Sequence, residues 1–113
     1  MKKGVADTVA VTALFLAAWA LVNGPVLRSP LGVYPVVDAK WHLEWAREVS
    51  RGNLFVYAPY FRAPLYPWLL GAWFFITGGG PVPGALFSML CGAGTAVTVH
   101  RLALRHAGRR TAL

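Results

Sequence analysis

Charged residues are scarce in this sequence. They make up 13% of its 113 residues, against roughly 25% in ordinary soluble domains. Two stretches hold no charged residue at all, one between Asp7 and Arg28 and one from Ala63 to Val99. The first covers about 20 positions, which at about 1.5 Å per residue is enough to span the hydrocarbon core of a bilayer. We therefore expect an integral membrane protein whose first transmembrane helix covers residues 8–27.

Cysteine is almost absent, and the residue patterns of several enzyme classes are missing. The single cysteine, Cys91, lies within an apolar run. It therefore excludes an internal disulfide and a cysteine-based metal cluster, and a role in helix packing is the simplest reading. The run Gly78-Gly79-Gly80 lacks the Lys-Ser/Thr of a phosphate-binding loop, so we expect a turn there. There is no Ser-His-Asp, Cys-His or dinucleotide-binding pattern, and the histidines are too widely separated to indicate a zinc site.

The second uncharged stretch is too long for one helix. Glycine and proline interrupt it at residues 78–83, and this break divides it into candidate spans at 64–77 and 83–103. Pro64 and Pro67 fit the first turn of the earlier span, where a missing N–H is tolerated. Small residues that favour close helix packing recur every four positions in the later span: Gly84, Ser88, Gly92 and Ala96. The predicted fold is all-α and membrane-embedded, with about three transmembrane helices and an external loop at 28–62.

The net charge of +7 comes from basic residues that flank the apolar segments. This distribution favours lipid headgroups over nucleic acid as the partner. Lys2 and Lys3 predict a cytoplasmic N-terminus, which puts the loop outside the cytoplasm. Three crossings would then leave the basic tail outside, against the positive-inside rule, unless further chain restrains the tail or the 64–77 segment does not fully cross. We expect that further chain restrains the tail.

The first apolar run also imitates a secretory signal. Lys2 and Lys3 precede it, and Ala18-Trp19-Ala20 matches the small-residue pattern of a cleavage site. However, the run continues past Ala20 to Leu27 and is followed by further apolar spans. An uncleaved membrane anchor therefore fits better.

A short amphipathic helix is expected inside the loop, at residues 39–50. Its apolar residues recur at three- and four-residue spacing, and its charged residues cluster at similar offsets. Because Trp41 and Trp45 lie on it, we expect it to rest at the membrane interface. Gly52 and Asn53 should end it.

Asp38 is the sharpest candidate for chemistry. A carboxylate just outside a membrane span can deprotonate an acceptor hydroxyl or hold a divalent cation. An aspartate directly before a helix is also a favoured N-cap, and both roles can hold at once. His42 follows one helical turn later, on a neighbouring position of the same face, although an isolated interfacial histidine is more often only a polar surface residue.

Three further residues are candidates for substrate binding. Arg62 could hold a phosphate with two parallel hydrogen bonds, or it could anchor the next span at the membrane interface. Tyr60 and Tyr66 could present hydroxyl groups to a substrate, or belong to the aromatic belt at the membrane surface.

In order along the chain, these features resemble the amino-terminal end of the GT-C membrane glycosyltransferases, in particular the protein O-mannosyltransferase and aminoarabinose-transferase-like group. The resemblance rests on Asp38 in the first external loop, the stretch Trp41-His42-Leu43-Glu44-Trp45-Ala46 that ends at Gly52, and the run from Tyr60 to Leu70, which contains Ala-Pro-Leu-Tyr-Pro. The glycine-rich break and the last span with its basic end also match. The resemblance covers essentially the whole chain.

The resemblance implies transfer of a sugar from a polyprenyl-phosphate carrier to an acceptor on the outer side of the membrane. Asp38 would act as base or metal contact, so a divalent metal is a candidate cofactor. It also implies a bacterial inner membrane protein whose loop at 28–62 is periplasmic or extracellular. Such enzymes have many more spans, so residues 1–113 would be the amino-terminal part of a longer chain, in contact with further spans. The family often carries a second acid where this chain has Ala39, so the expected site has one carboxylate.

Two other functions remain open. A small non-enzymatic membrane subunit or scaffold would use the amphipathic helix and the small-residue stripe only to bind partner helices. A fragment of a transporter is a more distant alternative. Further apolar spans downstream in the same reading frame would favour the enzyme.

Overall fold

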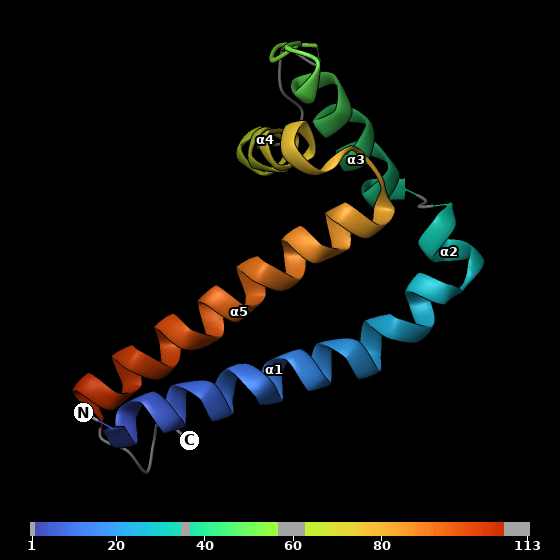
Figure 1. Ribbon diagram of the computed structural model, residues 1–113. Helices are drawn as coiled ribbons and strands as arrows, with labels where there is room; N and C mark the ends of the chain where they lie inside the picture. The colour runs from blue at the N-terminus through green and yellow to red at the C-terminus, as the bar shows by residue number, and fades with distance from the viewer. Residues whose placement is uncertain (1, 35–36, 57–62, 108–113) are drawn as a thin grey trace. The chain divides into compact units, whose positions relative to one another are not determined.

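The structure is a computed structural model that describes residues 2–34, 37–56 and 63–107. Its helices are α1 (Lys2–Arg28), α2 (Pro30–Val33), α3 (Val37–Ser50), α4 (Leu65–Thr77) and α5 (Pro81–His106), shown in Figure 1. No strand occurs in the described residues. The predicted all-α fold class is confirmed for this part of the chain.

Two helices of the described chain are long and apolar enough to cross a membrane. They are Gly4–Arg28, with 25 residues, and Pro81–His106, with 26 residues. The segment expected as the middle span forms α4, which is apolar but has 13 residues. Such a helix is about 20 Å long, which is shorter than the hydrocarbon core of about 30 Å. Two of the three expected spans therefore have the required length.

The first long helix ends one residue after the predicted end of the first span, which was residue 27. α1 passes through Pro25 and continues to Arg28. Proline fits the helical φ angle, so the helix can continue through it, although one hydrogen bond is lost and the ring crowds the carbonyl four residues earlier. The helix ends where the Ser29 backbone N–H and hydroxyl both donate to the Val26 carbonyl, at 3.1 and 2.6 Å.

The chain divides into two compact units. Unit 1 comprises Met1–Gly24 and Ser88–Leu113, and unit 2 comprises Pro25–Phe87. Unit 1 therefore holds most of the two long helices, and unit 2 holds α2, α3 and α4 with the first turns of α5. The predicted site residues belong to unit 2.

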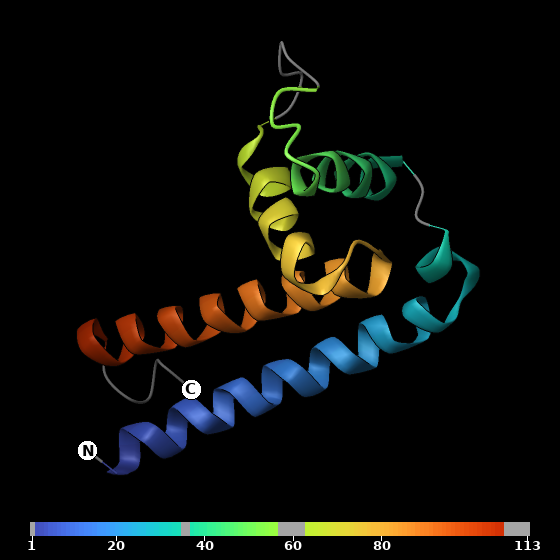
Figure 2. The same cartoon turned by 45° about the horizontal axis from the view of Figure 1, so that its top comes forward.

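The core of unit 2 lies between α3 and α4, which cross and pack against each other (Figure 2). Leu43 and Ala46 of α3 and Leu70 and Phe74 of α4 form a buried apolar cluster. Gly71 lets the two helices approach closely, because a Cβ there would overlap the Val49 side chain and lie 2.9 Å from the Ala46 carbonyl oxygen. Each fully buried large apolar side chain in such a cluster contributes about 1.5–3 kcal/mol.

Trp45 is buried by the chain itself. The sequence placed it on a helix expected at the membrane interface, and its side chain is 0% exposed. Leu43 and Ala46 on the same helix are buried too. The amphipathic pattern is confirmed, and its apolar face is covered by protein. An apolar stripe has the same period whether lipid or a neighbouring helix covers it, so periodicity alone could not distinguish the two.

The glycine run after α4 forms the predicted turn into α5. Gly78 has φ +79°, a left-handed conformation that glycine adopts without steric cost. Its N–H donates to the Phe74 carbonyl at 2.9 Å. The Trp73 indole N–H donates to the Pro83 carbonyl at 3.0 Å, which ties α4 to the first turn of α5.

In unit 1 the small-residue stripe makes the kind of contact that it predicted. A Cβ at Gly92 of α5 would overlap the Phe15 ring of α1, so the absence of a side chain admits that ring. Cys91 differs from its predicted packing role, because it is exposed. Threonine hydroxyls in this unit donate to carbonyls four residues earlier in their own helix, as Thr12 does to Thr8 at 2.9 Å. Such internal bonds satisfy hydroxyl groups without water.

Candidate functional site

Asp38 lies in the first turn of α3 and is exposed. The helix begins at Val37, so Asp38 stands inside the helix and not directly before it as expected. A carboxylate in this turn interacts favourably with the positive end of the helix dipole. Val37 has φ +50°, a backbone conformation that is rare for β-branched residues and costs about 1–3 kcal/mol. The structure therefore holds the backbone just before Asp38 in a strained conformation.

His42 lies one helical turn after Asp38 and is half-buried. Its ring stands edge-on to the Tyr66 ring of α4, with centroids 5.2 Å apart and an interplanar angle of 84°. It also meets the Trp41 ring at a centroid distance of 5.2 Å. Edge-to-face pairs of this kind stabilise by about 0.5–1.5 kcal/mol beyond the area they bury. The two helices therefore fix the orientation of the imidazole.

Tyr66 lies in the first turn of α4 and is 40% exposed. Its ring also approaches the Phe87 ring, at a centroid distance of 6.0 Å. The Tyr66 ring is thus packed against protein on one side, while part of the residue remains exposed. The structure brings His42 of α3 and Tyr66 of α4 together, and Asp38 lies one turn before His42 on α3. We call these three residues the α3 N-terminal site.

Tyr60 and Arg62, the other predicted substrate-binding residues, lie outside the described residues. Their proposed roles rest on the sequence alone. Metal binding stays a prediction as well. The described residues contain no group of three or more His, Cys, Asp or Glu side chains that could hold a metal ion.

The polar face of α3 carries surface ion pairs. Lys40 Nζ lies 3.9 Å from Glu44 Oε1 in an exposed pair one turn apart. Such a pair contributes about 0.3–0.5 kcal/mol. Lys40 and Glu44 therefore pair with each other at the surface of α3.

The C-terminal end of α3 is closed by a hydrogen-bonded cap. The Asn53 N–H donates to the Glu48 carbonyl at 2.9 Å and the Gly52 N–H to the Val49 carbonyl at 2.9 Å. Gly52 has φ +95°, as this type of helix end requires. The predicted stop at Gly52 and Asn53 is confirmed.

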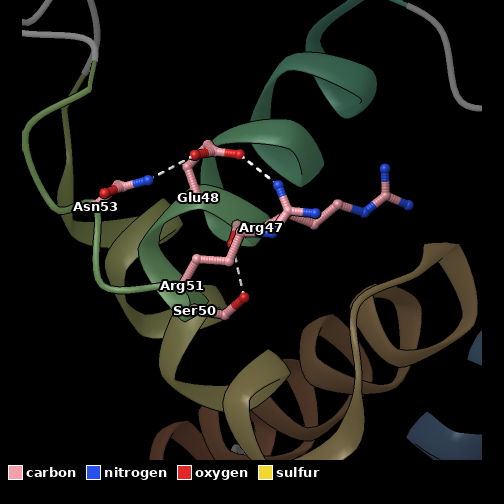
Figure 3. A network of polar contacts seen from close by, with 5 residues as sticks. All are labelled: Arg47, Glu48, Ser50, Arg51 and Asn53. Atoms are coloured by element: carbon pink, nitrogen blue, oxygen red, sulfur yellow. Dashed lines mark hydrogen bonds and ion pairs between the residues drawn. The ribbon is translucent and has the colours of Figure 1, made fainter.

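Side chains reinforce this cap around Glu48 (Figure 3). The Asn53 amide donates to Glu48 Oε2 at 2.9 Å, and Arg51 Nη1 donates to Glu48 Oε1 at 2.6 Å. The hydrogen bond from Asn53 is the main cause that lowers the pKa of Glu48 below its ordinary value of 4.5, and the bond from Arg51 adds to it. The Ser50 hydroxyl donates to the Arg47 carbonyl at 2.7 Å. The carboxylate of Glu48 thus serves the helix end.

An apolar groove of about 680 Å³ lies between the end of α3, the segment after it and α4. Trp68 helps to shape it, because its indole N–H donates to the Leu54 carbonyl at 3.2 Å and its ring stands edge-on to Phe55. The described lining residues are Val49, Ser50, Arg51, Gly52, Leu54, Phe55, Trp68, Gly71, Ala72, Phe75 and Ile76. None of the three residues of the α3 N-terminal site is among them.

Sequence reasoning did not find this groove. Its walls come from two helices and a connecting segment, so no local pattern marks it. The aromatic residues Phe55 and Trp68 were the only signal in the sequence, and they read equally well as part of a membrane-surface belt.

Comparison of the chain with protein-family models, with curated proteins and with solved structures finds no match.

Proposed function

We propose that this chain is the amino-terminal part of a membrane glycosyltransferase. The enzyme transfers a sugar from a polyprenyl-phosphate-linked donor to an acceptor on the outer face of the membrane. The order of residues that resembles the GT-C enzymes supports this reading. Two helices of spanning length with a separate helical segment between them are compatible with it.

In the proposed topology, α1 and α5 cross the bilayer and the loop at 28–62 lies outside the cytoplasm, at the bacterial inner membrane. The 13 residues of α4 and the burial of Leu70 and Phe74 against α3 favour an α4 that does not cross. With two crossings, the basic end of α5 returns to the cytoplasmic side together with Lys2 and Lys3. This arrangement obeys the positive-inside rule, which three crossings would violate.

The observation that carries the proposal is the contact between His42 and Tyr66 at the start of two helices, with Asp38 one turn away. The contact orients an imidazole and a phenol beside an exposed carboxylate. Groups of these types bind sugar hydroxyls and exchange protons with them. Tyr60 and Arg62 complete the proposed substrate-binding set, with the Arg62 guanidinium on a donor phosphate.

Asp38 has one of two roles in this proposal. As a general base it removes the proton from the acceptor hydroxyl as that oxygen attacks the sugar. As a cation ligand it needs few protein partners, because Mg²⁺ is often held by one or two carboxylates together with substrate phosphates. Both roles require the negative charge.

The test is the replacement Asp38→Asn in the full-length parent enzyme, assayed for sugar transfer at matched membrane expression. Asp38 is exposed in the first turn of α3, so loss of its charge removes only an interaction with the helix dipole and the stability should change by less than about 1 kcal/mol. Loss of the charge should reduce the rate about a hundredfold or more. Glu44→Gln is the matched control, because Glu44 is also an exposed acid on α3, and it should keep normal transfer. Normal transfer by the Asp38→Asn enzyme would refute the catalytic assignment.

A non-enzymatic membrane subunit or scaffold is the second candidate. It is favoured by the two long helices, almost none of whose residues are buried inside the described chain. Exposed apolar helix faces can pack against partner helices as well as against lipid. If this is the function, Asp38→Asn and Glu44→Gln should behave alike, and substitutions on the exposed faces of α1 or α5 should release a co-purifying membrane partner.

A further inference from the structure

Among the residues of unit 1 whose burial the structure describes, two side chains are buried, and both are titratable. Asp7 of α1 is 8% exposed and His100 of α5 is 2% exposed. Every other side chain whose burial the structure describes in unit 1 is exposed or only partly buried. An ordinary helix pair would bury its apolar residues first. The selective burial of an acid and an imidazole therefore needs an explanation.

The contact between Phe15 and Gly92 sets the level at which the two residues lie. α1 and α5 run in opposite directions within unit 1 (Figure 1). From this contact, Asp7 is eight residues back along α1 and His100 is eight residues forward along α5. Eight residues of helix cover about 12 Å. Because the two helices run in opposite directions, going back along α1 and forward along α5 leads toward the same end of the helix pair. Asp7 and His100 thus lie at about the same level, one on each helix.

Charge complementarity provides the reason for their joint burial. An ionised side chain between transmembrane helices is costly unless a partner compensates it, and such groups face the interior of a bundle and pair with one another. A carboxylate and an imidazole can share a proton or form an ion pair. The other described titratable side chains of the last turns of α5 are Arg101, Arg105 and His106, and all three are exposed.

We infer that Asp7 and His100 form an interhelical polar pair that fixes the register of α1 against α5. Apolar side chains can slide past one another in lipid at little cost, because lipid is as apolar as they are. A single polar pair between α1 and α5 supplies the specific contact that their apolar faces lack. This inference is independent of the proposed glycosyl transfer.

The register can be measured by thiol cross-linking. Val11 and Ala96 lie midway between the Phe15–Gly92 contact and the Asp7–His100 pair, and both are partly buried. The full chain in membranes, with Cys91→Ser, Val11→Cys and Ala96→Cys, should react with a short bis-maleimide. Linked peptides would be quantified by mass spectrometry and normalised to the fraction of protein that resists alkaline extraction.

In this background, Asp7→Asn and His100→Gln should each lower the cross-linking rate about threefold or more, the size expected for an interhelical hydrogen bond in a membrane. His106→Gln is the matched control and should leave the rate unchanged. The exchange Asp7→His with His100→Asp should restore the rate toward that of the parent. The inference is overturned if the single variants cross-link at the rate of the control. It is also overturned if the exchanged double variant cross-links as slowly as the two single losses together would predict.

Discussion

The imidazole of His42 on α3 meets the phenol ring of Tyr66 on α4 edge to face, with ring centroids 5.2 Å apart. The two residues are 24 positions apart in the sequence, and each was a candidate for a different reason. Their contact makes the start of α3 and the start of α4 a single structural feature. Two properties of Tyr66 can therefore be tested independently: the contact of its ring with His42 and the role of its hydroxyl group.

We expect the ring contact to be measurable as a coupling energy. His42→Ala and Tyr66→Ala should each destabilise unit 2, and the double variant should lose less than the sum of the two, with a coupling of about 0.5–1.5 kcal/mol. Denaturant unfolding in detergent micelles, followed by tryptophan fluorescence, measures it. Tyr66→Phe is the control because it keeps the ring, and it should retain stability while reducing sugar transfer if the hydroxyl contacts substrate. Additive losses in the double variant would contradict the contact.

Gly71, the one glycine of α4, should tolerate replacement by alanine poorly. Alanine there would place a Cβ against Val49 and the Ala46 carbonyl oxygen, and overpacking of this kind costs about 1–3 kcal/mol. This exceeds the gain of up to about 1 kcal/mol in helix propensity. Thermal unfolding of Gly71→Ala should therefore show a clear loss of stability.

The matched control is Gly94→Ala in α5, where a Cβ would have no neighbour within 4 Å. It should be neutral or slightly stabilising, since only the propensity term remains. Adding Val49→Ala to the Gly71→Ala variant should relieve the overlap and recover part of the loss. Equal stabilities of the two glycine variants would mean that α3 and α4 do not approach closely at Gly71.

The sequence predicted a structural feature well where neighbouring residues of the chain determine it, and poorly where packing against a distant segment determines it. The end of α3 was predictable because Gly52 adopts a positive φ within the chain segment itself. The end of α1 was predictable to within one residue because the uncharged run stops at Arg28. Trp45 was assigned to the membrane surface because its burial depends on α4, which lies about 20 residues further along the chain.

The candidate site shows the same limit. Asp38, His42 and Tyr66 were each identified from residue type and position, but the pairing of His42 with Tyr66 results from the packing of α3 on α4. The groove at the other end of α3 has walls from two helices and a connecting segment, and no periodic pattern in the sequence predicts such a surface.

The pKa of Glu48 should lie below 4.5, because hydrogen bonds from Asn53 and then from Arg51 favour the ionised carboxylate. Because the folded state lowers this pKa, the ionised carboxylate stabilises the folded state at pH values above 4.5, and the contribution is lost as the pH falls through the lower folded value. Asn53→Ala and Arg51→Gln should each raise the pKa back toward 4.5, because each removes a hydrogen bond to the Glu48 carboxylate. NMR titration of the Glu48 carboxyl carbon measures these shifts. A pKa in the parent protein at or above 4.5 would contradict the capping network.

The last prediction concerns membrane topology, where two and three crossings differ at the end of α5. The positions Lys40 and His106 are both exposed, and each can carry a single cysteine in a Cys91→Ser background. With two crossings, Lys40→Cys should react with a membrane-impermeant maleimide added to intact cells, and His106→Cys should react only after the membrane is opened. The physical reason is that α4, with 13 residues, is shorter than the hydrocarbon core of about 30 Å, whereas α1 and α5 are not. Labelling of both positions in intact cells would show that α4 crosses after all and restore the three-span arrangement. Labelling of Lys40→Cys only in opened membranes would reverse the orientation and remove the α3 N-terminal site from the outer face.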